Sequence, residues 1–193
     1  MNYLAHSFLS FSDEQIVGQF LNDYIPNKDR FSLPENILQG IILHREIDSF
    51  TDSHPQIHLA KKVFSPWVRL YSGAFVDVAM DYFLANDHRI ASPDQWKSHA
   101  ERVYEVLESH LNYFPKSFEN VLSRMKTDNW LYNYREDWGI EFSLKNVLNR
   151  AKYLDKNIPV FQVFLDHKEE LSQCYEQFFP DLQKHISSVN QNF

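Results

Sequence analysis

Apolar residues recur along the chain at intervals of three and four, which is the pattern of amphipathic helices. Residues that favour helix starts divide this pattern: Ser12 precedes two acidic residues, Pro34 opens a long apolar stripe, and Ser92 is followed by Pro93. The segment "TDNWLYNYRED" at 127–137 fits no single element. We predict helices over residues 2–10, 13–25, 34–53, 55–64, 67–87, 92–113, 115–126, 136–155 and 158–189, the last broken near Asp166 or Pro180.

The predicted elements define the fold class. No segment alternates apolar and polar residues as a half-buried strand does. The chain has 193 residues, 44% of them apolar, and only 4 glycines, which argues against Gly-rich nucleotide loops and β architectures with many tight turns. We therefore predict an all-α protein, a compact irregular helical bundle forming one domain over residues 1–193.

Charge and composition exclude several functions. The net charge of −7 does not support a broad nucleic-acid surface. No run of about 18 apolar residues suits a membrane span, and the first residues lack the pattern of a secretory signal. The single cysteine cannot form an internal disulfide. We expect a cytoplasmic protein with no nucleic-acid or membrane partner; the sequence leaves the oligomeric state open.

The helix predicted over 34–53 carries polar groups on its apolar stripe. Ile37 and Ile41 begin the stripe, and His44, Asp48 and Thr51 continue it at helical spacing. His44 and Asp48 are four residues apart, so their side chains can meet on one face. Asp52 extends this polar end by one more residue.

Other predicted helices repeat the pattern. Asp77 and Asp81 lie one turn apart among apolar residues of the helix at 67–87. Asp23 follows Phe20 on the apolar face of the second helix, and His6 lies among apolar residues of the first. Carboxylates and imidazoles on several apolar stripes indicate a shared buried polar site.

Two interpretations of these residues remain open. Buried carboxylates are costly unless they are paired or bind a cation, and a divalent metal held by His and Asp is one solution, with Mn, Fe and Zn all suited to that ligand mixture. Such a metal can activate water and stabilise charge on a phosphoryl group. The alternative is a structural network in which Asp77 and Asp81 pair with Arg45 or Arg69 and His6 is merely a buried histidine. Spacing alone does not choose between them.

Four segments of the chain carry a family resemblance. "MNYLAH" at the start, "GQFLND" at 18–23, "GIILHREIDSFTDSHP" at 40–55 and "DVAMDYFLA" at 77–85 resemble the bacterial acyl carrier protein phosphodiesterases, and weaker similarity continues to "FFP" at 178–180. That family is regarded as a distant relative of the HD phosphohydrolases, so the resemblance implies an HD-phosphohydrolase-like helical fold. Tyr82 departs from the pattern, because many members have His at this position.

The resemblance implies a reaction and its residues. The family hydrolyses the phosphodiester that joins 4′-phosphopantetheine to a serine of holo-acyl carrier protein, usually with Mn²⁺. Asp23 is then a metal ligand or general base, and Arg45 stabilises charge on the phosphate unless it only pairs with a neighbouring carboxylate. The matching metal-site residues are His6, Asp23, His44, Asp48, Asp77 and Asp81.

The substrate protein requires a docking surface. An acyl carrier protein is acidic and so is this chain, so docking must depend on local basic residues. The candidates for this rim are Lys28, Arg30, Lys61, Lys62 and Arg69. Two alternative functions stay open, a small-molecule phosphohydrolase with the same metal site and a non-enzymatic helical binding module whose polar cluster is structural.

Overall fold

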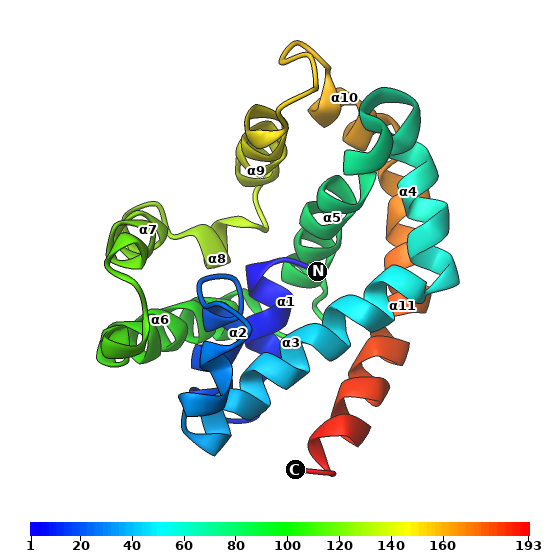
Figure 1. Cartoon of the computed structure of the whole chain (residues 1–193). Helices are drawn as coiled ribbons and strands as arrows, with labels where there is room; N and C mark the ends of the chain where they lie inside the picture. The colour runs from blue at the N-terminus through cyan, green and yellow to red at the C-terminus, as the bar shows by residue number, and fades with distance from the viewer.

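A computed structural model describes all 193 residues, and it contains helices and no strands, which confirms the predicted all-α class (Figure 1). No helix is both long enough and apolar enough to cross a membrane. The helices are α1 (Tyr3–Phe8), α2 (Asp13–Leu21), α3 (Glu35–Ser53), α4 (Pro55–Val68), α5 (Ser72–Asn86), α6 (Pro93–Ser109), α7 (Lys116–Thr127), α8 (Trp130–Asn133), α9 (Asp137–Arg150), α10 (Val160–Asp166) and α11 (Lys168–Asn190), with 3₁₀ turns η1 (Asp29–Ser32), η2 (Arg69–Tyr71) and η3 (Leu111–Tyr113).

Several helix starts confirm the predicted capping. The Ser12 side chain accepts a hydrogen bond from the Gln15 N–H at the start of α2. Ser92 and Gln95 cap each other reciprocally at the start of α6. The predicted break near Asp166 is present as the junction between α10 and α11, whereas Pro180 lies inside α11.

Several predicted boundaries are wrong: the helix predicted over 67–87 begins at Ser72, and the one predicted over 136–155 ends at Arg150. α4 continues through Pro66 to Val68, although a proline inside a helix removes one hydrogen-bond donor. The Ser65 hydroxyl donates to the Lys62 carbonyl at 3.4 Å, so this carbonyl still has a partner. α2 ends at Leu21, four residues earlier than predicted.

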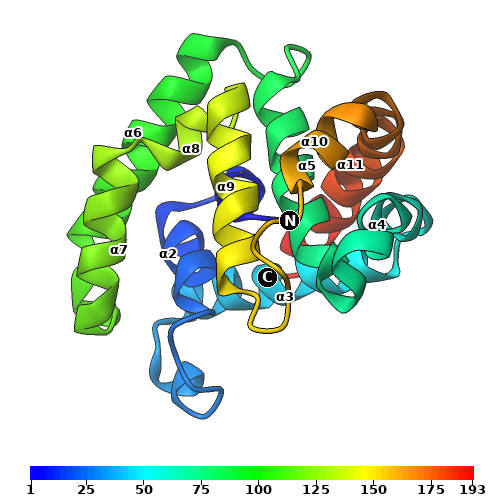
Figure 2. The same ribbon diagram turned by 90° about the horizontal axis from the view of Figure 1, so that it is seen from above.

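The helices surround one continuous apolar core to which every helix from α1 to α11 contributes. α4 and α11 pack together on one side, with α3 and α5 beside them (Figure 1). Seen from above, α6 and α7 lie on the opposite side and α9 lies between the two groups (Figure 2). The N-terminus lies near the middle of the fold, so α1 is surrounded by other elements.

The closest helix packing joins α2 to α3. A Cβ on Gly18 would lie 2.1 Å from the Ile37 carbonyl oxygen, and a Cβ on Gly40 would lie 2.3 Å from the Gln15 carbonyl oxygen. Real Cβ atoms do not approach oxygen so closely, so only glycine permits this backbone contact. The contact brings the C-terminal end of α2 against the middle of α3, where His44 is located.

Replacing Gly40 by alanine tests this packing. We expect Gly40→Ala to lower the free energy of unfolding by about 3 kcal/mol, because the added methyl group forces two backbones apart. Gly73→Ala is the matched control: its Cβ would meet only the flexible Lys61 side chain at 3.4 Å, so we expect a change within about 1 kcal/mol. Urea denaturation of both variants measures the difference, and equal stabilities would contradict the packing argument.

Candidate metal centre

A cavity of about 330 Å³ opens where α1, α2, α3, α5 and α9 meet. Its wall is mostly polar, in contrast to the apolar core beside it. The side chains that line it come from the first 77 residues, with Arg150 as the one contribution from the later chain: Met1, Asn2, Tyr3, His6, Gln19, Phe20, Asp23, His44, Asp48, Thr51, Asp52, Asp77 and Arg150.

Two stacked histidines form the floor of this cavity. The rings of His6 and His44 lie 4.0 Å apart between centroids and nearly parallel, at 16°. Gln19 fixes both rings: the His44 Nδ1 lies 2.8 Å from its backbone carbonyl oxygen, and the His6 Nδ1 lies 2.9 Å from its side-chain Oε1. Since both oxygens accept hydrogen bonds, each Nδ1 carries a proton, which leaves each Nε2 free to face a proton or a metal.

The free nitrogens of both rings face Asp48. Its Oδ1 lies 3.3 Å from the His6 Nε2, and its Oδ2 lies 3.2 Å from the His44 Nε2. One ligand atom from each of these three residues lies within 4.8 Å of the other two. Each Nε2 therefore either shares a proton with the Asp48 carboxylate or binds a metal cation together with it.

His6 and Asp48 can adopt the protonation states that bind a metal. Burial lowers the pKa of His6, so its ring is neutral near pH 7. Burial alone would raise the pKa of Asp48, but hydrogen bonds with His44 and His6 lower it below its usual range, so the carboxylate is charged. Neutral imidazole and ionised carboxylate are the forms that bind divalent metals.

Two polar atoms of residues that line the same cavity lack hydrogen-bond partners, which also indicates that the cavity suits a bound ligand. Thr51 Oγ1 and Gln19 Nε2 are buried without a hydrogen-bond partner in the protein. Both residues line the cavity. Buried polar atoms in native proteins almost always have partners, so these two groups are suited to water or ligand atoms held in the cavity.

Asp23 lies at the rim of this cluster. Its Oδ1 is 3.5 Å from the His44 Nε2, and 48% of its side chain is exposed. The Asn22 side-chain amide donates to the same oxygen at 3.3 Å. Asp23 is thus close enough to reach a ligand in the cavity while remaining open to solvent.

Arg45 points away from the cavity, because its guanidinium bonds the loop after α2. Its Nε donates to the Asn22 Oδ1 at 3.3 Å, and its Nη2 donates to the Asn27 Oδ1. Arg45 therefore holds the loop that follows Asp23. The guanidinium that lines the cavity belongs instead to Arg150, in the last turn of α9.

The paired aspartates of α5 lie in two different environments. Asp77 lines the cavity, but its Oδ1 accepts a hydrogen bond from the Met1 ammonium group at 2.8 Å. Asp81 is fully buried outside the cavity lining and accepts N–H bonds from Asn2 at 3.1 Å and Leu4 at 2.8 Å. Burial raises the pKa of Asp81 to about 7 despite these donors. Asp81 thus holds the start of α1 in place.

The five predicted docking residues are dispersed over two segments. Lys28 and Arg30 lie in the loop between α2 and α3, and Lys62 and Arg69 are exposed in and after α4. Lys61 contacts the rim of the cavity, because its ammonium group pairs with Asp52 at 2.7 Å. Only Lys61 is thus placed beside the cavity, and contact of all five residues with a partner stays a prediction.

The lining residues outside the predicted site set include Gln19, Thr51 and Arg150. Gln19 lies inside the segment "GQFLND" that carries the family resemblance. Nothing in the sequence indicates that it contacts the two histidines. Thr51 belongs to the predicted stripe of α3. Arg150 gave no signal, because its approach to the cavity depends on how α9 packs against α5.

Comparisons with known proteins agree on one family. The family model described as "Acyl carrier protein phosphodiesterase" matches residues 1–182. Proteins named acyl carrier protein phosphodiesterase include one from Photorhabdus laumondii, 26% identical over 93% of this chain and 92% of its own length, and one from an Enterobacter strain, 29% identical over 93% and 94%. One from Yersinia pestis is 28% identical over 95% and 96%.

No solved structure matches the chain, so the expected likeness to HD phosphohydrolases stays a prediction.

The cluster predicts tight Mn²⁺ binding that depends on its histidines. We expect His44→Ala to weaken Mn²⁺ binding at least tenfold. Removing a residue that only hydrogen-bonds a ligand already costs about tenfold in affinity, so removing a ligand should cost at least as much. His185→Ala is the matched control, since His185 contacts Glu46 and lies outside the cavity lining. Calorimetry on chelator-treated protein measures both affinities, and unchanged binding in His44→Ala would remove this residue from the centre.

Asp81 is predicted to affect stability more than metal binding. Asp81→Asn turns one accepting oxygen into a donor facing the N–H groups of Asn2 and Leu4. We expect the free energy of unfolding to fall by about 1–3 kcal/mol, the cost of leaving a buried polar group unpaired. Mn²⁺ affinity should stay within about threefold of wild type, because the ligand cluster is untouched. A large loss of affinity with unchanged stability would instead make Asp81 a ligand.

Proposed function

The chain belongs to the acyl carrier protein phosphodiesterase family, and on that premise we propose that it hydrolyses the phosphodiester between 4′-phosphopantetheine and a serine of holo-acyl carrier protein. The products are apo-acyl carrier protein and free 4′-phosphopantetheine. The observation that carries the proposal is the cluster of His6, His44 and Asp48 at the floor of an open cavity. A metal-dependent phosphodiesterase needs such a cation site beside a space for the phosphate.

Charge around the cavity explains why a cation is needed. Four aspartates and one arginine line it, and a phosphodiester is an anion. Two of the carboxylates are already paired, Asp52 with Lys61 and Asp77 with the Met1 ammonium group. Asp23 and Asp48 have no lysine or ammonium partner, so their carboxylates would repel the phosphodiester anion. Two like charges about 4 Å apart repel by about 4 kcal/mol at the effective dielectric near a protein surface. A divalent cation on His6, His44 and Asp48 would offset this repulsion of the substrate.

We assign this cation as Mn²⁺, which suits mixed imidazole and carboxylate ligands. When bound, the metal supplies positive charge against the phosphoryl oxygens and lowers the pKa of the attacking water. His6 and His44 present their Nε2 lone pairs to it, held in that orientation by Gln19. Arg150 lines the same cavity and adds a second positive charge for the phosphate.

Asp23 is proposed as the general base. It is not part of the three-residue ligand cluster, yet its Oδ1 lies 3.5 Å from the His44 Nε2 and its side chain is open to solvent. It can take a proton from the water that attacks phosphorus. A bond then forms between phosphorus and the water oxygen, the bond from phosphorus to the serine oxygen breaks, and that oxygen takes up a proton. Arg45 acts as a positioning residue through Asn22 and Asn27.

Docking of the acidic carrier protein requires positive charge on the surface outside the cavity. We propose that the exposed cations Lys28, Lys62 and Arg69, with Arg30 and Lys61, attract the acidic partner to the side of the cavity. Arg69 adopts a positive φ of 52°, and the following Leu70 side chain is fully exposed. An exposed leucine between basic residues suits contact with an acidic, partly apolar helix.

The reaction is tested by intact-mass spectrometry of holo-acyl carrier protein incubated with this protein and Mn²⁺, with EDTA as the control. We expect metal-dependent loss of the phosphopantetheine mass. In ¹⁸O-labelled water, the label should appear in the released 4′-phosphopantetheine and not in the apo-protein, because water attacks phosphorus. No mass loss with Mn²⁺, Fe²⁺ or Zn²⁺ would refute the proposed reaction.

The variant Asp23→Asn tests whether Asp23 acts as a general base or as a metal ligand. We expect turnover of holo-acyl carrier protein to fall by at least about 100-fold, as for loss of a general base, with Mn²⁺ affinity unchanged within about threefold. Asp13→Asn is the matched control: Asp13 is also 48% exposed, lies at the other end of α2 and pairs with Arg102. If Asp23→Asn weakened Mn²⁺ binding in proportion to turnover, Asp23 would be a ligand.

A further inference from the structure

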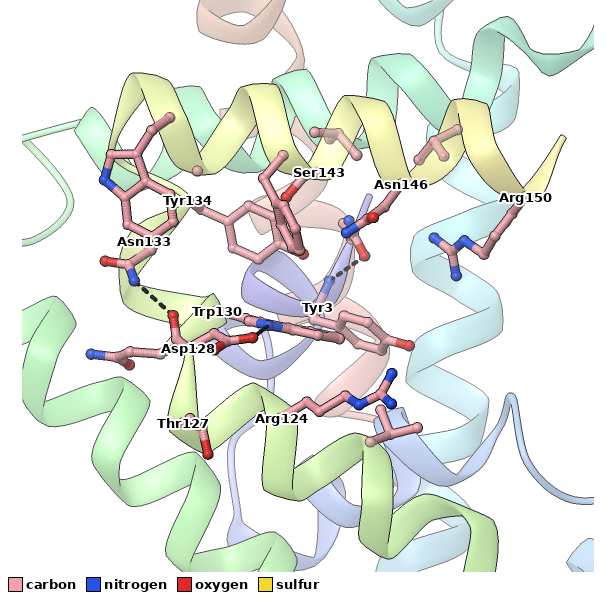
Figure 3. Close-up of a pocket in the computed structure, with 18 of the residues that line it drawn as sticks. Tyr3, Arg124, Thr127, Asp128, Trp130, Asn133, Tyr134, Ser143, Asn146 and Arg150 are labelled. Carbon is pink, nitrogen blue, oxygen red and sulfur yellow. Dashed lines mark hydrogen bonds between the residues drawn. The ribbon is translucent and has the colours of Figure 1, made fainter. Parts of the chain in front are cut away.

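A second and larger cavity, of about 990 Å³, lies beside the candidate metal centre. α7, α8 and α9 form most of its wall, and α1 closes one side (Figure 3). It therefore depends on the part of the chain after residue 120, whereas the metal centre depends almost entirely on the first 77 residues.

The two cavities share a wall. Asn2, Tyr3 and Arg150 line both of them. The Tyr3 ring stacks on Phe20 at 5.2 Å between centroids, and Phe20 lines the metal cavity. A group bound at the metal centre and extended past Tyr3 would therefore enter the larger cavity without crossing the core.

The lining of the larger cavity is mostly uncharged and rich in amides. Five asparagine side chains line it, together with six aromatic rings. Its one carboxylate belongs to Asp128, whose Oδ2 accepts a hydrogen bond from the Trp130 indole N–H at 3.4 Å. Amide side chains both donate and accept hydrogen bonds, so this lining suits a ligand that contains uncharged amide groups and short apolar stretches.

Positive charge is confined to one end. Figure 3 shows Arg124 and Arg150 reaching toward the end of the cavity at which the Tyr3 hydroxyl lies. Trp130, Tyr134 and Asn133 lie farther from Arg150 in the same view. Trp138 and Phe142, which also line the cavity, are 56% and 47% exposed. The cavity thus runs from a cationic end beside the metal centre to a neutral, aromatic part that reaches solvent.

We propose that this second cavity binds the pantetheine arm of the substrate, with the phosphate at the Arg150 end and the sulfur end toward Trp138 and Phe142. The inference rests on the proposed function. The arm is uncharged, carries two amides and a hydroxyl group, and is joined to the phosphate that the metal centre must hold. The cationic end of the cavity lies beside the metal centre, as the phosphate requires, and amides and aromatic rings line the rest, as the uncharged arm requires.

The assignment makes the cavity a specificity determinant rather than part of the chemistry. Hydrogen bonds from asparagine amides to the arm would be missing with substrates that lack it, so such substrates would bind less tightly. A small phosphodiester would then need only the metal centre, while the carrier-bound substrate would use both cavities.

Ser143→Trp tests the assignment by filling the cavity. Ser143 is half-buried in α9 and lines the larger cavity only. Ser172→Trp is the matched control, because Ser172 is a half-buried serine that lines a different cavity between α5 and α11. Phosphate-free pantetheine is titrated into each protein by calorimetry. We expect Ser143→Trp to bind it at least about tenfold more weakly than wild type, and Ser172→Trp to bind within about twofold.

A second readout uses two substrates. We expect the ratio of turnover on holo-acyl carrier protein to turnover on bis(p-nitrophenyl) phosphate to fall about tenfold in Ser143→Trp and to stay within about twofold in Ser172→Trp. An unchanged ratio with unchanged pantetheine binding would overturn the inference. If Ser143→Trp fails to fold by circular dichroism, Asn146→Leu, which removes an amide of nearly the same size, replaces it under the same criteria.

Failure of the proposed reaction is distinguishable from failure of this inference. If wild-type protein leaves holo-acyl carrier protein intact, the reaction is refuted and pantetheine binding alone decides the cavity. Binding that Ser143→Trp removes would still support the assignment, and no binding to wild type would overturn it. If wild-type protein hydrolyses the carrier protein but Ser143→Trp changes neither readout, the proposed reaction stands. The assignment of the larger cavity to the pantetheine arm is then overturned.

Discussion

The contact between α2 and α3 at Gly18 and Gly40 is the constraint on which the site depends. It brings the last turn of α2 against His44. Because α2 ends at Leu21, the Gln19 carbonyl lies in the final turn, where backbone oxygens have no partner within the helix. The His44 Nδ1 supplies that partner at 2.8 Å. One glycine-dependent contact therefore satisfies a helix end and fixes the orientation of a candidate ligand.

The same residue organises the second histidine. Gln19 accepts from His44 with its backbone and from His6 with its side chain, so α1 and α3 are both oriented by one residue of α2. Each ring is left with its Nε2 toward Asp48. The three groups are thus held in place by the fold itself, and a cation that bound them would stabilise the folded state by its binding energy.

Helical spacing was sufficient to predict some of the site and not the rest. His44 and Asp48 were predictable because their meeting depends only on residues four apart in one helix. Asp81 gave the same signal, but its helix turns that carboxylate toward the start of α1, and spacing specifies a face without specifying what packs on it. Arg150 gave no signal, because its position depends on contacts between distant segments. The helical class followed from the pattern, whereas the packing of α9 did not.

The division between the two cavities follows the order of the chain. The candidate ligands lie on α1 and α3, and Asp23 follows α2. α2 and α3 pack tightly through Gly18 and Gly40, and a metal centre requires such rigidity because ligand geometry tolerates small errors only. The larger cavity is built mainly on α7 to α9, where half-exposed aromatic rings and asparagines allow adjustment. Tyr3 and Arg150 join the two parts. A substrate that spans both cavities would be hydrolysed at the rigid metal centre and selected by contacts in the more adaptable larger cavity. Substitutions in the later helices should therefore change substrate preference without disturbing the chemistry.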